Sequence, residues 1–72
     1  MKDKKLEVIK KFVKVRTTLT HQNILLNYLR EIENTIEKID EIKLDKVFEN
    51  FVYDLLSEST DRNYWKERYY SV

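Results

Sequence analysis

Apolar side chains recur along this chain mainly at intervals of three and four residues, the spacing of one face of an α-helix. The first run predicts a helix over residues 3–16, with apolar residues on one half of its circumference and lysines on the other. The apolar residues of this helix are Leu6, Val8, Ile9, Phe12, Val13 and Val15. The threonines of segment 17–20 lower helix propensity and favour helix caps, so we expect the helix to end there.

A second helix is predicted over residues 20–40 and a third over residues 45–57. The second has a seam of apolar residues spaced alternately by four and three, formed by Leu25, Leu29, Ile32, Ile36 and Ile39. The apolar residues of the third helix are out of phase with this seam. Either the chain turns near residues 40–45, with Asp45 capping the third helix, or one continuous helix presents two apolar faces; we favour the turn.

Serine, threonine and acidic residues at positions 57–61 predict a further loop, followed by a short helix over residues 61–70. No segment shows the period-two alternation that indicates a half-buried strand. The predicted fold class is therefore all-α: a single domain over residues 1–72, built as a small antiparallel bundle of three main helices and a short C-terminal helix. Large apolar side chains are numerous for a monomer of this size, so we expect a homodimer.

The C-terminal helix combines aromatic with basic side chains, a composition enriched at the energetic hot spots of protein interfaces. The residues predicted to bind a protein partner are Tyr64, Trp65, Arg68, Tyr69 and Tyr70. For Trp65 and Tyr69, which share one face of the helix, the alternative is that they cover a small core with their polar tips at water. We favour this alternative for these two residues and expect Tyr64 and Tyr70 to be exposed.

The net charge is only +1, but the charges are segregated along the chain. Residues 1–16 carry an excess of five positive charges, and residues 17–60 carry an excess of five negative ones. The segregation indicates either an electrostatic docking surface or, in the simpler interpretation, a basic helix that packs beside acidic ones. The candidate contacts to a nucleic acid or an acidic partner are Lys4, Lys10, Lys11 and Lys14.

The chain contains no Gly, Pro or Cys, and no Ala, which excludes glycine-rich phosphate loops, disulfides and thiolate chemistry. His21 is the single histidine and is expected to be solvated, so no metal site of the common kinds is predicted. The few serines have no base at a meaningful spacing. We therefore predict no enzymatic activity, no cofactor and no small-molecule substrate.

Two further expectations concern the setting of the protein. Ala, Gly and Pro have GC-rich codons, so their absence indicates an AT-rich gene, as in phages and plasmids of low-GC bacteria. No apolar run approaches the roughly 18 residues that span a bilayer, and the first residues lack the features of a secretory signal. We expect a cytoplasmic protein that does not act at a membrane.

By elimination, the predicted function is protein binding by a small regulatory or adaptor protein. The aromatic C-terminal helix is then the binding element and the basic first helix an electrostatic guide. The alternative is a small DNA-binding regulator of helix-turn-helix type that uses the basic first helix, although the helix after residues 18–23 is acidic and the usual turn glycine is missing. A third alternative is a structural or assembly subunit.

Overall fold

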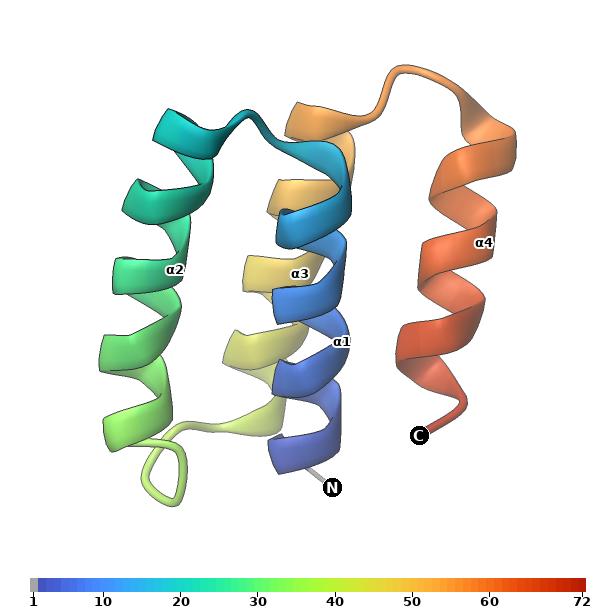
Figure 1. Ribbon diagram of the computed structural model, residues 1–72. Helices are drawn as coiled ribbons and strands as arrows, with labels where there is room; N and C mark the ends of the chain where they lie inside the picture. The colour runs from blue at the N-terminus through green and yellow to red at the C-terminus, as the bar shows by residue number, and fades with distance from the viewer. Residues whose placement is uncertain (1) are drawn as a thin grey trace.

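The computed structural model describes residues 2–72 and contains four α-helices and no strand within that range. Helix α1 spans Lys2–Arg16, α2 spans Leu19–Asn34, α3 spans Glu41–Leu55 and α4 spans Ser59–Tyr70. Consecutive helices run in opposite directions, as Figure 1 shows. The predicted all-α class and the antiparallel bundle are confirmed.

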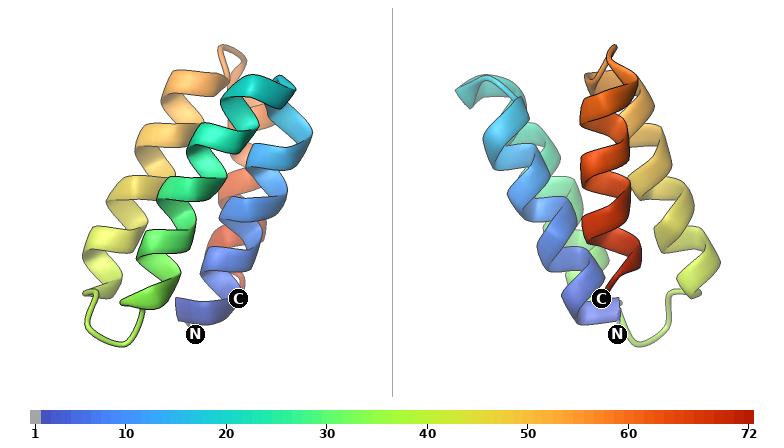
Figure 2. Two further views of the ribbon diagram at one scale, coloured as in Figure 1. Left: turned by 60° about the vertical axis from the view of Figure 1, so that its left-hand side comes forward. Right: turned by 90° about the vertical axis from the view of Figure 1, so that its right-hand side faces the viewer.

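Helix α1 is the centre of the bundle and contacts each of the other three helices. Helices α2 and α4 lie on opposite sides of it, and α3 packs behind it against α4 (Figures 1 and 2). The Cα atoms of α2 stay more than 8 Å from those of α3 and α4. The Cα envelope measures 32 × 28 × 15 Å, so the bundle is flattened.

The loop between α2 and α3 confirms the predicted turn and corrects its position. Helix α2 ends at Asn34, because the Thr35 hydroxyl and amide both donate to the carbonyl of Ile32. Helix α3 begins at Glu41, because the Asp40 carboxylate accepts the Ile42 amide at 3.1 Å and caps the helix. The prediction that Asp45 is this cap is wrong.

The core is formed by the apolar faces of all four helices, with the largest share from α1. Its buried members are Leu6, Val8, Ile9, Phe12, Val13, Leu29, Ile32, Leu44, Phe48, Val52, Leu56, Trp65 and Tyr69. Val15 is not among them: it is 63% exposed, contrary to the prediction. It follows Lys11 by one helical turn and therefore lies on the solvent side of α1.

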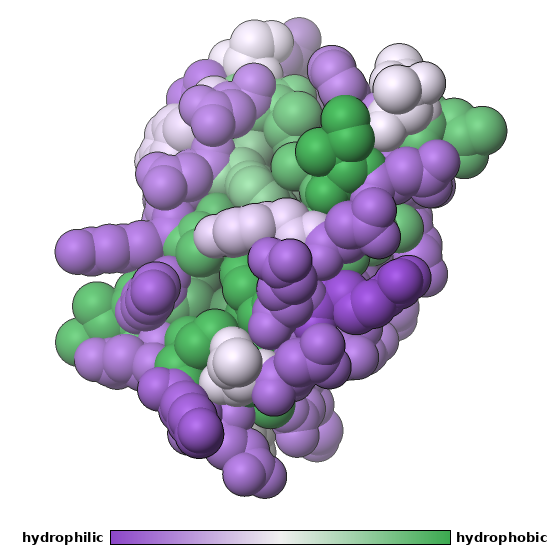
Figure 3. Space-filling view, turned by 90° about the vertical axis from the view of Figure 1, so that its left-hand side faces the viewer, coloured by the Kyte–Doolittle hydropathy of each residue, from purple (hydrophilic) through white to green (hydrophobic). Residues whose placement is uncertain are grey.

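The surface on the α2 side of the bundle is unusually apolar. Figure 3 shows apolar side chains emerging in a band across this face, bordered by charged ones. Several apolar residues of the predicted seam and of α3 are only partly covered here, among them Leu25, Ile39, Val47 and Phe51. No helix within residues 2–72 is long and apolar enough to cross a lipid bilayer.

Candidate interaction face between α1 and α4

The residues predicted to bind a protein partner lie on two opposite sides of α4. Trp65 and Tyr69 are 4% and 0% exposed, whereas Tyr64 and Tyr70 are 52% and 47% exposed. The expectation that Trp65 and Tyr69 cover the core is confirmed, because residues four apart share the inner face of the helix. The expectation that their polar tips reach water is wrong, because the Trp65 indole nitrogen is buried and the hydroxyl of the fully buried Tyr69 donates to Asp45. Tyr64, Arg68 and Tyr70 are the members of the set whose side chains a partner can reach.

Aromatic rings from α1 and α3 hold the inner face of α4. The ring of Phe12 meets Trp65 edge-on at 5.2 Å between centroids, and it meets Phe48 edge-on at 6.4 Å. Such pairs contribute about 0.5–1.5 kcal/mol each beyond their buried area. The Trp65 indole nitrogen is buried and has no hydrogen-bond partner within the described residues. Helix α4 is therefore fixed by ring packing rather than by a bond to the indole.

A buried polar cluster fixes the other end of α4. The Lys5 side chain, only 9% exposed, donates to Asp45 at 3.1 Å, and the Tyr69 hydroxyl donates to the same carboxylate oxygen at 2.7 Å. Burial, followed by the bond to Asp45, raises the pKa of Tyr69 well above its ordinary value. Lys5 was not predicted to be buried, although it precedes Ile9 and Phe12 by four and seven residues and so shares their face.

Two tyrosines between α3 and α4, Tyr53 of α3 and Tyr70 of α4, also have intramolecular partners. The Tyr70 hydroxyl donates to Glu49 at 2.7 Å, and burial together with this bond raises the pKa of Tyr70. Lys66 donates to the Tyr53 hydroxyl at 3.2 Å; this bond, followed by the charge of Glu49, raises the pKa of Lys66. These contacts reduce what the α3 side offers to a partner.

Much of the charge on α1 is neutralised inside the molecule. Lys10 pairs with Glu33 of α2, and Arg16 pairs with Asp61 of α4 at 3.4 Å. Lys2 donates to two backbone carbonyls of the α2–α3 loop. The simpler interpretation of the charge segregation, a basic helix packed beside acidic ones, is confirmed for Lys10 and for Lys5, whose ion-pair partners Glu33, Glu41 and Asp45 lie on α2 and α3.

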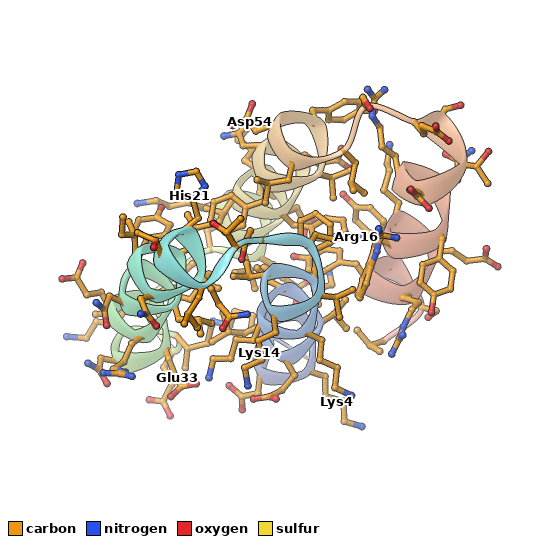
Figure 4. The ribbon with its side chains drawn as sticks, turned by 45° about the horizontal axis from the view of Figure 1, so that its top comes forward. Lys4, Lys14, Arg16, His21, Glu33 and Asp54 are labelled. Atoms are coloured by element: carbon orange, nitrogen blue, oxygen red, sulfur yellow. The ribbon has the colours of Figure 1, made fainter. Side chains whose placement is uncertain are left out.

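Three of the four predicted contact lysines remain without an ion pair in the described part of the chain: Lys4, Lys11 and Lys14. Figure 4 shows that Lys4 and Lys14 project from the same side of α1, away from the core. Lys10 is the exception, because its pair with Glu33 ties it to α2. The exposed basic surface of α1 is therefore narrower than the sequence predicts.

The two predicted binding surfaces meet in one groove. A shallow depression of about 310 Å³ between α1 and α4, the α1–α4 groove, is lined by Lys4, Glu7, Val8, Lys11, Arg68, Ser71 and Val72. Three cationic side chains thus face one carboxylate side chain. Arg68 is held at the rim by its 3.0 Å bond to the Tyr64 hydroxyl and lies over the Trp65 ring at 5.3 Å. Such a groove is suited to an anionic group beside an aromatic or apolar one.

Potential metal ligands do not gather in the described part of the chain. No cluster of three or more potential metal ligands is present within residues 2–72. Two acidic residues at the end of α2 and after it have structural roles, since Glu33 pairs with Lys10 and Asp40 caps α3. His21 is exposed at the start of α2, as predicted (Figure 4).

Comparison of the chain with models of protein families, with curated proteins and with solved structures finds no match in any of the three.

Proposed function

We propose that this protein acts without enzymatic activity, as a small regulatory or adaptor protein that binds an acidic segment of a partner protein in the α1–α4 groove. The observation that supports the proposal is the convergence in this groove of Lys4, Lys11 and Arg68, which come from opposite ends of the chain. Tyr64, half-exposed beside Arg68, supplies the aromatic contact that is common at interface hot spots.

The groove favours a peptide over a membrane or a small substrate. It is shallow, so it does not enclose a molecule as substrate pockets do. Its cations are placed on two packed helices and are thus partly preorganised, which lowers the entropic cost of binding. Guanidinium and ammonium groups attract carboxylates, and their excess over the single carboxylate of Glu7 selects against basic partners.

The second candidate function is binding of DNA along α1. It is supported by the exposed lysines Lys4, Lys11 and Lys14. Figure 4 shows Lys4 and Lys14 on the same side of α1, and Lys11 follows Lys4 by two helical turns. Against it, α2 places Glu33 beside α1, where it pairs with Lys10, and this carboxylate repels a phosphate backbone. Binding to a protein segment needs only the local groove, so we rank it first.

We also infer that the chain forms a homodimer, a state that a structural or assembly subunit shares. Its support is the number of large apolar side chains left at the surface, among them Leu19, Ile24 and Ile42. An assembly subunit is expected to form oligomers larger than a dimer, so the mass of the oligomer in solution distinguishes this role from that of a dimeric regulator.

The test uses fluorescence anisotropy with three labelled probes: a glutamate-rich peptide, a neutral peptide of the same length and a DNA duplex. The triple variant Lys4→Glu, Lys11→Glu, Arg68→Glu reverses the groove. A matched control, Arg30→Glu, Lys38→Glu, Lys46→Glu, makes the same change of charge at exposed positions elsewhere. We expect the acidic peptide to bind the wild type and the control, with at least tenfold weaker binding to the groove variant.

Two outcomes contradict the proposal. Equal affinity of both variants for the acidic peptide shows that the groove is not its site. Preferential binding of the duplex, lost in the groove variant, replaces the protein partner by a nucleic acid. Capture of partners from host extract, with nuclease and with both variants in parallel, then identifies the natural ligand: only a protein held by the control and lost by the groove variant counts.

A further inference from the structure

A second, apolar groove lies between α2 and α3, on the side away from α4. It has a volume of about 330 Å³ and is lined by Tyr28, Glu31, Ile32, Thr35, Ile39, Lys43, Leu44 and Val47. We call it the α2–α3 groove. It exists because the backbones of α2 and α3 do not approach within 8 Å, so only side chains bridge the two helices.

The surroundings of this groove are apolar well beyond its lining. The Tyr28 ring lies 6.2 Å from the Phe51 ring across the two helices, and both remain in part accessible. Val47 and Leu55 are likewise only partly covered, and Ile24 is 61% exposed. Figure 3 shows apolar surface on this α2 side of the molecule. Continuous apolar surface of this kind marks a site of association.

We propose that a second copy of this chain covers the α2–α3 groove in a two-fold symmetric dimer, with α2 and α3 of both copies forming a four-helix arrangement. The proposal rests on the homodimer inferred above and gives it an interface. The lining of the α2–α3 groove shares no residue with the lining of the α1–α4 groove, so the two surfaces can be occupied at the same time.

The charges on the groove walls match a second copy. Glu31 lies in the last turn of α2 and Lys43 in the first turn of α3, so both stand at the end of the groove beside the α2–α3 loop. They are on opposite walls and form no ion pair with each other within the described residues. A two-fold axis parallel to the helices exchanges the walls at the same level, so each Glu31 comes to face Lys43 of the partner subunit.

The same charges disfavour other occupants. With one acidic and one basic residue, the lining has no excess charge that would attract a nucleic acid or an anionic lipid surface. A two-fold copy supplies the apolar face and both complementary charges at once. The flattened bundle, 15 Å thick in its shortest Cα dimension, gains a second layer of helices over the α2–α3 groove.

The test is sedimentation velocity over a wide concentration range, with four variants: Glu31→Lys, Lys43→Glu, the double exchange, and Tyr28→Asp. We expect a wild-type dimer that dissociates on dilution. Each single reversal should raise the dimer Kd by about tenfold through two like-charge contacts, and the double exchange should restore it. Tyr28→Asp should give a monomer whose helical content, measured by circular dichroism, is unchanged. Val15→Asp, at an exposed position outside the groove, is the matched control.

The outcomes separate this inference from the proposed function. A wild type that is monomeric at every concentration overturns both the dimer and its interface, while peptide binding in the α1–α4 groove is untouched. A dimer whose Kd responds to Val15→Asp but not to either single charge reversal, Glu31→Lys or Lys43→Glu, overturns the interface alone. The double exchange keeps the net charge and the composition. It therefore tests the interface independently, even if Tyr28→Asp does not fold.

Discussion

The ring of Tyr69 lies flat against the ring of Phe48, with the centroids 4.0 Å apart and the ring planes inclined by 6°. The hydroxyl of the same tyrosine donates to Asp45, one helical turn before Phe48 on α3. Stacking and hydrogen bond together fix both the position and the rotation of α4. Because α4 is fixed in this way, Tyr64 and Arg68 are presented at the surface by a rigid helix rather than by a mobile tail.

The stability of the fold should fall at alkaline pH because of Tyr69. In the unfolded chain this phenol loses its proton near the ordinary pKa of 10.0, whereas burial and the bond to Asp45 keep it protonated in the fold. Stability is therefore fully present below about pH 10 and decreases above it, by about 1.4 kcal/mol per pH unit for one such group. Urea unfolding monitored by circular dichroism between pH 8 and pH 11 (about one unit beyond the ordinary pKa) measures the slope.

The variant Tyr69→Phe isolates this effect. At neutral pH it should lose about 1.5–3 kcal/mol, the value of a hydrogen bond to a charged group, and its stability should depend less steeply on pH. Tyr70→Phe should also reduce the slope, because the pKa of Tyr70 is raised by burial and by Glu49. An unchanged slope in Tyr69→Phe would contradict the assignment.

Two substitutions of Trp65 should separate the contribution of its volume to stability from the contribution of its indole N–H group. Trp65→Ala is expected to cost about 3–5 kcal/mol, because it leaves a cavity against Phe12. Trp65→Phe should cost only about 1–2 kcal/mol, since the indole nitrogen has no partner to lose. Urea titration followed by circular dichroism compares the two. Equal losses would mean that the indole nitrogen is bonded in solution, for instance by a water.

The cap of α3 should be measurable at a single residue. Asp40→Ala removes the acceptor of the Ile42 amide and is expected to cost about 0.5–2 kcal/mol. Thr18→Ala is the matched control, because Thr18 occupies the same position before α2 but makes no side-chain capping bond. Thermal unfolding of both variants tests the contrast, and a larger loss for Thr18→Ala would refute it.

The buried pair of Lys5 and Asp45 should behave as one unit. Lys5→Met leaves the partly buried Asp45 without its cation, and Asp45→Asn leaves the buried Lys5 with Glu41 as its ion-pair partner at 3.5 Å, so each should destabilise the fold. The double variant should lose less than both single losses together, by about 0.5–3 kcal/mol. A complete double-mutant cycle in urea provides the coupling; strictly additive losses would show that the two charges act independently.

Binding in the α1–α4 groove should be sensitive to ionic strength. Lys4 and Lys11 are exposed, and charges at a surface are screened over about 10 Å at 0.1 M salt. The Kd for the glutamate-rich peptide should therefore rise with salt in the wild type and rise less in Lys11→Glu. Titrations at several salt concentrations measure both dependences, and parallel curves would remove Lys11 from the site.

The sequence predicted the four helices but misplaced the end of α2 and the start of α3. Helical periodicity predicted four helices because each buries a stripe that recurs every three or four residues. It extended α2 to residue 40 because Ile36 and Ile39 continue the seam. In the structure these two residues lie in the α2–α3 loop and still pack against the core. Their apolar character therefore reflects burial in a loop and not a continued helix. Tertiary packing therefore replaced the helix that local periodicity implies.

The candidate site was predicted in its parts but not in its assembly. Tyr64 and Tyr70 were expected at the surface and Trp65 and Tyr69 in the core, because the helical period assigns them to different faces. The meeting of Arg68 with Lys4 depends on how α4 packs on α1, a long-range relation that one sequence does not contain. Ion pairing of Lys10 with Glu33 was likewise decided by the packing of α1 on α2.

The central position of α1 has a consequence for synthesis of the chain on the ribosome. Helix α1 is synthesised before the three helices that it contacts, and the rings that cover Phe12 and Phe48 belong to α4. Until Trp65 and Tyr69 have been translated, two large aromatic residues of the nascent chain lack their cover. While only α1, α2 and α3 have emerged, these two rings are therefore exposed, and the four-helix bundle is complete only after α4 has left the exit tunnel.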